Sequence, residues 1–391
     1  MSYTSSRYAK HIARKEIIHI VSELVRKNTV NPPGNEYRVK DIITRRMKAL
    51  GMKVSYHEKK SGRLNIVGTI GKGKKSIAFV SHMDTVPPGD RELWHTDPFT
   101  PTLKKGRIYG RGTLDDKGSF ACAYSACKAF IAEHLHFDGR IILIAAADEE
   151  LGSSLGIIYL LNEGLVRFDA AIIPDGGKMN LSIYGEKGVC WIQVTSTGVQ
   201  AHGSTPALGK NAIEPLAAFV DALKELRLPK KFHPAFDGWT MNVGTITGGI
   251  AANVVPAKTE AVIDFRLPQG ITSHDVLKAL QRIVTQVKKR YPYAKLTLQI
   301  QHETQPHIVS LDSEIAQSFH KAAKKLRIPM KYKTFGGNTV AKNLYEKGIP
   351  SVVHYPGNDA LAHVPNEYVV IDELIQGSIL YAETLAQYFG L

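Results

Sequence analysis

The sequence predicts an α/β protein with a mostly parallel sheet, helices on both faces of that sheet, and an inserted α+β domain. In the first 180 residues, short apolar runs alternate with helical patterns, which is typical of parallel strands joined by helical crossovers. After residue 185 the pattern changes to a β-α-β-β-α-β order, and strand-helix alternation then resumes to the end.

The elements of the first part follow from periodicity. Residues 8–27 carry apolar residues at helical spacing, and the turn-rich segment "TVNPPGNE" predicts a loop after them. Further helices are expected at 36–50, after residue 115 and at 154–163. The apolar runs expected to form strands are 52–57, 64–70, 76–81, 139–147 and 169–174.

The inserted domain is expected at 187–301 and should be ferredoxin-like. Its strands are expected in "GVCWIQVTSTGV", "EAVIDFRLP" and "KLTLQIQ", and its helices in "NAIEPLAAFVDALKELR" and "SHDVLKALQRIVTQVKKRY". Residues 1–186 and 302–391 would then form one domain, which ends with the helix "EIAQSFHKAAKKL", the strand "SVVHY" and the helix "IDELIQGSILYAETLAQYF".

Composition sets limits on function. The 391 residues are 43% hydrophobic and carry a net charge of +14. Such a charge can indicate nucleic-acid binding, but the basic residues are dispersed and often lie beside acids, as in "KKLRIPMKYK". We therefore expect solvated surface charge and no nucleic-acid partner; salt-sensitive binding to DNA or RNA would restore that alternative.

Cysteine content and hydropathy indicate where in the cell the protein is located. The cysteines Cys122, Cys127 and Cys190 are odd in number and lack CxxC spacing, which argues against a disulfide framework and a thiolate zinc site. The segment "MSYTSSRYAKHIARKE" lacks the apolar core of a signal peptide, and no apolar run approaches the ~20 residues that span a bilayer. We expect a cytoplasmic protein without a membrane partner.

Polar residues at the ends of predicted strands indicate chemistry. In "SIAFVSHMDTVPPG", His82 and Asp84 share one face of a strand, and a metal-binding imidazole commonly donates its second N–H to a carboxylate. On this segment alone, a His–Asp pair without metal remains an alternative. In "GRGTLDDKGS", helix capping accounts for one of Asp115 and Asp116 but less well for both.

A third strand end carries the most negative charge. In "ILIAAADEELGSS", an apolar run leads directly into Asp148, Glu149 and Glu150, and burying unpaired carboxylates there would cost several kcal/mol. Because Glu149 and Glu150 are adjacent, they diverge, so one can bind a metal while the other takes a proton from water.

Two further segments complete a candidate metal-binding set. "AAIIPDGG" delivers Asp175 after a strand, and "GNDALAHVPNEYV" supplies His363 in a late loop. Mixed imidazole and carboxylate ligands fit Zn²⁺, Mn²⁺ or Co²⁺ better than Ca²⁺, and five ligands with one bridging carboxylate suit two ions. The predicted ligands are His82, Asp115, Glu150, Asp175 and His363.

These motifs resemble those of the M20 family of metallopeptidases and deacylases, whose catalytic domain is zinc-peptidase-like. The matching segments occur in the family's order over nearly the whole chain. They are "TVNPPG", "SHMDTVPPG", "GRGTLDDKG", "ADEELGS", "IPDGG", "AHGSTP", "GGIAANVVPA", "DFRLP", "FGGNTVA" and "AHVPNE".

The resemblance implies a role for each residue. His82 and Asp175 would hold one metal, Glu150 and His363 the other, and Asp115 would bridge them. Asp84 would orient His82, and Glu149 would be the general base and acid. The resemblance also implies a cis peptide bond between Asp115 and Asp116.

The inserted domain resembles the family's lid and dimerisation domain. His202 would reach a partner subunit's active site and stabilise an oxyanion. Arg266 would grip a substrate carboxylate, with a pair to Asp264 as the alternative. The substrate-binding positions that the resemblance implies are His202, Asn253, Arg266, Gly336, Gly337 and Asn338.

The resemblance implies hydrolysis of the amide bond of a small peptide or N-acyl amino acid. Two divalent ions, most simply Zn²⁺, would activate the attacking water, and Glu149 would take its proton. Asp175 stands where the family's deacylases usually have Glu, which favours a peptide; "GGNTVA" lacks the usual Asp or Ser, so substrate recognition stays open. The alternatives are a deacylase of the acetylornithine deacetylase or succinyl-diaminopimelate desuccinylase type, a non-catalytic binding protein, and a structural metal site.

Overall fold

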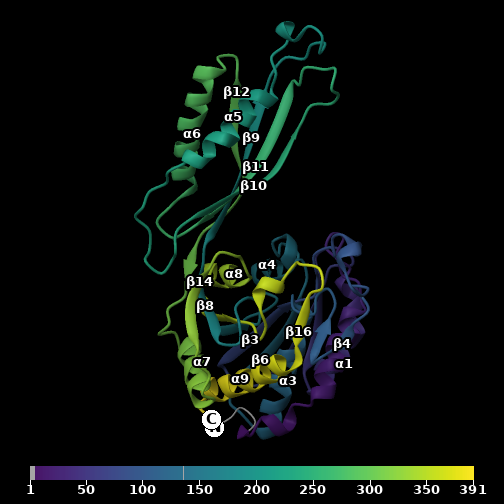
Figure 1. Cartoon of the computed structure of the whole chain (residues 1–391). Coiled ribbons are helices and arrows are strands. Elements are labelled where there is room, and N and C mark those ends of the chain that lie inside the picture. The colour runs from purple at the N-terminus through teal and green to yellow at the C-terminus, as the bar shows by residue number, and fades with distance from the viewer. Residues whose placement is uncertain (1–4, 135) are drawn as a thin grey trace. The chain divides into compact units, whose positions relative to one another are not determined.

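The computed structural model describes residues 5–134 and 136–391. The chain divides into two compact units (Figure 1). Unit 1 contains the chain up to residue 184 together with 309–333 and 339–391, and unit 2 contains 185–308 and 334–338.

Unit 1 is built on a mixed sheet in the order β1-β2-β6-β3-β7-β15-β8, with β13 and β14 also pairing with β8. The strands of this sheet are β1 (Lys53–Glu58), β2 (Leu64–Gly71), β3 (Ser76–His82), β6 (Arg140–Ala146), β7 (Ala170–Ile173), β8 (Leu181–Glu186), β13 (His307–Ile308), β14 (Lys331–Phe335) and β15 (Ser351–His354). β8 and β14 run from unit 1 into unit 2, and β13 belongs to unit 2.

The predicted α/β class is confirmed, with one correction to the sheet. Parallel pairing joins β6 to β3, β3 to β7 and β7 to β15. The pairs β1–β2, β2–β6 and β15–β8 are antiparallel, so the sheet is mostly parallel only at its centre. The sequence did not reveal this because β1 and β2 are joined by a short turn, which permits a hairpin, and apolar content does not encode strand direction.

Helices flank this sheet. α3 contacts β3 and β6, α2 contacts β1 and β2, and α7 and α8 contact β15. The helices of unit 1 are α1 (Arg14–Val25), α2 (Lys40–Ala49), α3 (Lys117–Glu133), α4 (Ile157–Asn162), α7 (Glu314–Lys325), α8 (Ala341–Glu346) and α9 (Ile371–Phe389). A small second sheet, β16-β5-β4, was not expected; its strands are β4 (Thr102–Lys104), β5 (Arg107–Tyr109) and β16 (Tyr368–Val370).

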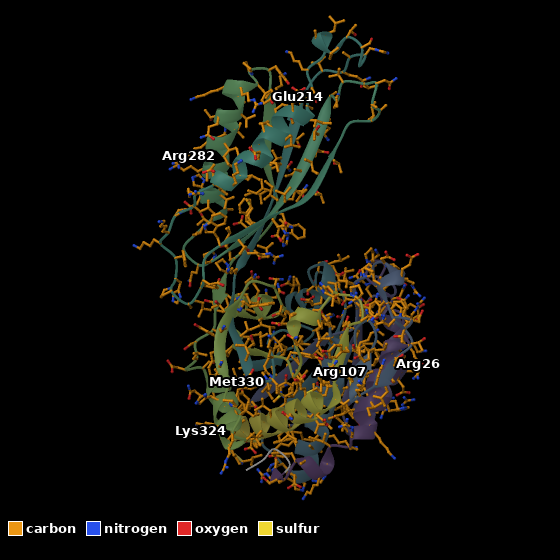
Figure 2. All side chains as sticks on the ribbon, in the orientation of Figure 1. Arg26, Arg107, Glu214, Arg282, Lys324 and Met330 are labelled. Atoms are coloured by element: carbon orange, nitrogen blue, oxygen red, sulfur yellow. The ribbon has the colours of Figure 1, made fainter. Side chains whose placement is uncertain are left out.

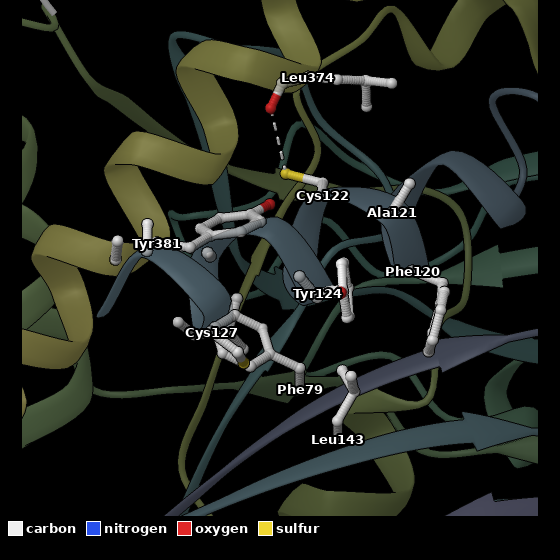
Figure 3. Packing of buried hydrophobic residues seen from close by; sticks show 14 of the residues in the cluster. Phe79, Phe120, Ala121, Cys122, Tyr124, Cys127, Leu143, Leu374 and Tyr381 are labelled. Carbon is white, nitrogen blue, oxygen red and sulfur yellow. Dashed lines mark hydrogen bonds between the residues drawn. The ribbon is translucent and has the colours of Figure 1, made fainter. Parts of the chain in front are cut away.

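The core of unit 1 lies where α3 and α9 pack together over the sheet (Figure 3). Phe79 of β3 and Tyr381 of α9 are fully buried, with ring centroids 5.7 Å apart. The thiol of Cys122 lies 3.6 Å from the carbonyl oxygen of Leu374. Cys122, Cys127 and Cys190 are free and buried, in agreement with the prediction that they form no disulfide framework.

Unit 2 contains the antiparallel sheet β10-β11-β9-β12 with two helices, in the β-α-β-β-α-β order. Buried residues of α5, α6 and the sheet form its own core. The elements are β9 (Gly188–Thr197), α5 (Ile213–Ala222), β10 (Thr240–Gly248), β11 (Lys258–Leu267), α6 (Ser273–Arg290) and β12 (Lys295–Thr304).

Basic side chains are dispersed over the surface. Arg26, Arg107, Arg282 and Lys324 are exposed and lie in four separate parts of the chain: just after α1, in β5, in α6 and in α7 (Figure 2). This distribution agrees with the expectation of solvated charge. Among the described residues, no helix has the length and apolar character needed to cross a membrane.

Candidate metal centre

The candidate site lies at the carboxyl ends of the central strands. β3 ends at His82, β6 ends just before Glu149 and Glu150, and β7 ends two residues before Asp175. Since these strands are parallel, their carboxyl ends share one edge of the sheet. The topology thus brings together residues far apart in the chain.

Three of the predicted ligands form a tight cluster. His82, Asp115 and Glu150 each offer a ligand atom within 4.8 Å of the others. The Nε2 atom of His82 lies 2.9 Å from Oδ1 of Asp115. His82 is 3% exposed and the Asp115 side chain 15%, so the cluster is largely shielded from water.

His363 approaches the same cluster from the loop before β16. Its Nε2 lies 3.1 Å from Oδ2 of Asp115 and 3.2 Å from Oε2 of Glu150. The His363 side chain is 51% exposed, which leaves this side of the cluster open to solvent. Its φ of 64° is in the left-handed region, which a non-glycine residue rarely adopts without support from its surroundings.

The electrostatics of the cluster couple the imidazoles to the carboxylates. Burial works against a charged His82, yet Asp115 and Asp84 raise its pKa well above the usual value. Hydrogen bonds to Asp115 and Glu150 raise the pKa of His363 to about 10. Without a metal ion, protons on the imidazoles thus balance the carboxylates.

Asp84 has a wider role than the sequence indicated. The Nδ1 atom of His82 lies 3.1 Å from the Asp84 carbonyl oxygen and 3.4 Å from its carboxylate. The fully buried carboxylate also accepts the backbone N–H groups of Glu149, at 3.0 Å, and Glu150, at 3.1 Å. Asp84 therefore supports both His82 and the turn that carries the two glutamates.

A buried polar network continues from Asp84, and the sequence analysis did not identify it. The amide of Asn31 donates to Asp84 at 2.8 Å and to Asp148 at 3.3 Å. Arg63 donates to Asp148 at 3.0 Å and forks onto Glu36, whose carboxylate is fully buried. The motif "TVNPPGNE", which contains Asn31 and Glu36, was the available signal.

Glu149 lies beside the cluster and makes no side-chain hydrogen bond or ion pair within the described part of the chain. Burial raises its pKa well above that of an ordinary carboxyl, and the nearby charge of Asp175 adds to this increase. Asp175 is half-buried after β7. The peptide bond between Asp115 and Asp116 is cis, as the resemblance implied, and Asp116 accepts the backbone N–H of His82 at 3.0 Å.

In unit 2, His202 and Asn253 lie on adjoining loops. The backbone N–H of Gly203 donates to the Asn253 carbonyl oxygen at 2.7 Å. The Ser204 backbone N–H donates to Nδ1 of His202 at 3.0 Å. An Nδ1 atom that accepts a hydrogen bond leaves the neutral imidazole with its proton on Nε2, which is then a donor. His202 is exposed, so this donor is accessible.

Arg266 pairs with Asp264, which was the alternative to binding a substrate carboxylate. Its Nε and Nη2 atoms donate to one carboxylate oxygen of Asp264, at 3.1 and 2.9 Å. Both side chains are about one-quarter exposed, so a substrate carboxylate would compete with Asp264 for the guanidinium. Gly336, Gly337 and Asn338 follow β14 and belong to unit 2.

Comparison with known proteins identifies the family. The model of peptidase family M20/M25/M40 matches residues 78–387. The chain belongs to this family. An uncharacterized metallohydrolase of Methanocaldococcus jannaschii is 31% identical over 407 residues, which cover 95% of this chain and 99% of that protein. An acetylornithine deacetylase of Myxococcus xanthus is 30% identical over 338 residues, which cover 84% of this chain and 85% of the relative.

Solved structures share the fold of this M20 protein. Human carnosine dipeptidase 1 superposes with a TM-score of 0.80 at 19% identity, covering 98% of each chain. Family membership makes the chain a metal-dependent hydrolase of peptide or other amide bonds, as the motifs indicated.

The donor set fits divalent metal ions of the kind that M20 enzymes use. The imidazole nitrogens of His82 and His363 and the carboxylate oxygens of Asp115 and Glu150 lie close together, and these are ligands that such ions accept. Both His82 and His363 have raised pKa values because carboxylates surround them, and a divalent cation would replace those protons.

Proposed function

We propose that this M20 protein cleaves the amide bond of a small peptide or N-acyl amino acid at a site that holds two divalent ions, most simply Zn²⁺. His82 and Asp175 would hold one ion, Glu150 and His363 the other, and Asp115 would lie between them. Such ions polarise a carbonyl oxygen and lower the pKa of a coordinated water.

The environment of Glu149 carries the proposal. Adjacent Glu150 interacts with His363, whereas the Glu149 carboxylate has no such partner within the described residues. Its raised pKa, caused by burial, makes it a stronger base than an exposed carboxylate, and nearby cations would bring that pKa back toward neutrality. A base with a pKa near the working pH is best suited to proton transfer.

The residues of this chain divide the proton transfers between them. Glu149 accepts a proton as the water oxygen attacks the amide carbonyl carbon, and it later returns that proton to the departing amine nitrogen. The Nε2–H of His202 from a partner subunit would donate to the developing oxyanion. Arg266, Asn253 and the segment Gly336–Asn338 would bind the carboxylate end of the substrate.

Substitution of the two adjacent glutamates tests this assignment. Glu149→Gln should lower kcat by at least 10²–10⁴-fold and leave metal content unchanged, because general acid–base catalysis contributes about that much. Glu150→Gln, the matched variant one residue away, should lose metal affinity as well as activity. Metal content by atomic emission and initial rates distinguish the two, and a Glu149→Gln protein with wild-type rates would refute the mechanism.

The substrate class is tested with a panel. The protein loaded with Zn²⁺, Mn²⁺ or Co²⁺ is offered dipeptides, N-acetyl amino acids and N-succinyl amino acids, with Glu149→Gln as the blank. Asp175 favours a peptide substrate, whereas the relative that is named a deacetylase favours an N-acyl amino acid. Turnover of acylated amino acids alone would decide for the deacylase.

We further propose that unit 2 mediates a homodimer, as the resemblance implied. β10 is an edge strand of its sheet, and Ile246, Leu208 and Ile250 are 54%, 77% and 79% exposed in one chain. Unpaired edges and exposed apolar side chains favour association. Light scattering should give a dimer mass, and Ile246→Lys should give a monomer; a monomeric wild-type protein would exclude the proposal.

A further inference from the structure

Arg111 and Glu367 form a buried ion pair next to the candidate metal centre. The Arg111 Nη1 atom lies 2.5 Å from Oε2 of Glu367, and the side chains are 1% and 0% exposed. They lie far apart in the sequence, within the motifs "GRGTLDDKG" and "AHVPNE". Neither residue touches the cluster of ligand atoms, and the proposed mechanism gives neither a role.

Glu367 holds the turn that carries Asp115. Its Oε1 atom accepts the backbone N–H of Leu114 at 2.8 Å and that of Asp115 at 3.2 Å. Its own carbonyl oxygen accepts the N–H of Gly110 at 3.0 Å. The carboxylate therefore fixes the position of the Asp115 main chain, and with it the direction of the Asp115 side chain.

Arg111 contacts two other loops with its second amino group. Nη2 donates to the carbonyl oxygen of His363 at 3.3 Å and, more weakly, to that of Pro87 at 3.4 Å. The carbonyl oxygen of His363 belongs to the residue with the left-handed backbone. A non-glycine residue keeps that conformation only when its surroundings hold it, and the guanidinium supplies such a contact.

The segment after β3 is held in the same way. The Arg111 guanidinium carbon lies 5.3 Å from the ring centroid of Trp94, and the Trp94 indole N–H donates to the Pro88 carbonyl oxygen at 2.8 Å. This segment begins five residues after His82. One buried pair thus joins the three chain segments that carry or adjoin His82, Asp115 and His363.

The pair is poorly explained as a device for stability alone. Removing two charges from water is costly, and well-packed apolar residues in place of a buried ion pair are often equally stabilising. The Nε atom of Arg111 is also buried without a hydrogen-bond partner within the described residues, which adds to this cost. The hydrogen bonds from this pair to the loops of Asp115 and His363 give a reason for keeping two charges buried here.

We propose that Arg111 and Glu367 are positioning residues that hold Asp115 and His363 in the geometry required for metal binding. The inference rests on the proposed function, because it takes these two residues as ligands. Outer partners of metal ligands typically contribute 10- to 100-fold to metal affinity or activity. Arg111 and Glu367 do not contact the ligand side chains; they act on Asp115 and His363 through hydrogen bonds to the main chain.

The experiment compares metal binding with stability in four full-length proteins. They are the wild type, Glu367→Gln, the double variant Arg111→Met/Glu367→Leu, and the control Glu383→Gln. Glu383 is 2% exposed and pairs with Lys325, so the control also loses a buried carboxylate, but on α9 and away from the ligand loops. Zn²⁺ dissociation constants come from competition with a chromogenic chelator, Co²⁺ spectra report ligand geometry, and urea unfolding is measured on metal-free protein.

We expect the double variant to be less stable than the wild type, because the backbone N–H groups of Leu114 and Asp115 lose their acceptor. It should stay folded, because its apolar pair removes both charges together. Its Zn²⁺ affinity should nevertheless fall by about 10- to 100-fold, and its Co²⁺ spectrum should change. Glu367→Gln should show the same loss of affinity even if it is less stable, whereas Glu383→Gln should bind Zn²⁺ as the wild type does.

Three results would overturn different parts of this reasoning. If the wild type binds Zn²⁺ and both Glu367 variants bind it equally tightly with unchanged Co²⁺ spectra, the pair has no positioning role. If Glu383→Gln loses as much affinity as the Glu367 variants, the effect is a general loss of stability. If the wild type itself binds no divalent ion, the proposed function fails, and the inference fails with it.

Discussion

Two buried histidines at the ends of central strands should behave oppositely on acidification. His82 ends β3 among carboxylates, which raise its pKa, whereas His354 ends β15 among aromatic rings. The ring centroid of His354 lies 5.1 Å from Phe319 and 5.6 Å from Tyr381, and burial lowers its pKa to about 4. His354 should therefore stay neutral in the folded protein at any pH well above 4.

The size of the effect follows from linkage. A histidine in the unfolded chain has a pKa of 6.5, and His354 in the folded chain has one of about 4. Between these values the unfolded chain binds more protons, so the free energy of unfolding falls as the pH falls. The loss begins near pH 6.5, reaches about 2 kcal/mol at pH 5 and is complete at about 3.4 kcal/mol below pH 4.

The assay is urea unfolding of metal-free wild type and of His354→Gln, at pH 7.5 and pH 5.0. Gln cannot titrate, and its amide can replace the hydrogen bond from His354 Nε2 to the Met179 carbonyl oxygen, which is 3.2 Å long. Removing the metal eliminates the separate effect of ligand protonation. Other titrating groups are common to both proteins, so the wild type should lose about 2 kcal/mol more than the variant.

An equal loss in both proteins would refute this reasoning. It would mean that the folded protein keeps a protonated His354, with its two N–H groups donated to the Tyr381 hydroxyl, 3.1 Å from Nδ1, and to the Met179 carbonyl. Hydrogen bonding would then outweigh the cost of burying the charge. A titration of the His354 ring by NMR would show the same result as a pKa near or above 6.5.

Three further predictions concern the surroundings of the site. Arg63→Met should lower the free energy of unfolding by about 3–5 kcal/mol, because it leaves the buried carboxylates of Glu36 and Asp148 without their cation; a urea-measured loss below about 1 kcal/mol would contradict this. Chelation of the metal should lower the calorimetric unfolding temperature, by the equivalent of about 4 kcal/mol when free metal had been at a thousand times its Kd, and an unchanged temperature would argue against the site. Gly156→Ala should cost about 1–3 kcal/mol in urea, since an added Cβ would lie 1.9 Å from the Ala147 carbonyl oxygen; unchanged stability would show that the turn after β6 can move aside.

Strand-end chemistry is the part of the site that the sequence could predict. Each central strand is a short apolar run, and polar residues such as His82, Glu149 and Asp175 follow directly at its end. Because parallel strands end at a common edge, the convergence follows from the fold class. The α/β class and the family were predictable for the same reason: both depend on local patterns in a fixed order.

The supporting network was not predictable, because its members are joined only by the tertiary structure. Arg63 directly precedes a strand, and no local pattern distinguishes it from an arginine on the surface. In the structure it contacts Glu36, which lies earlier in the chain, and Asp148, which lies later. Arg111 and Glu367 are likewise joined across more than 250 residues. The antiparallel pairing of β1 with β2 and of β2 with β6 was also not predictable, because the spacing of apolar residues does not depend on strand direction.

The insertion of unit 2 into unit 1 has a consequence for synthesis. Four of the five proposed ligands precede the insertion, and His363 follows it. The strand β15, which fills the place between β7 and β8, and the helix α9 are also made last. On the ribosome, the continuous stretch 185–308 can fold first, while unit 1 waits with an open gap in its sheet. The metal centre is therefore completed only after unit 2 has been made, when His363 and β15 have emerged from the ribosome.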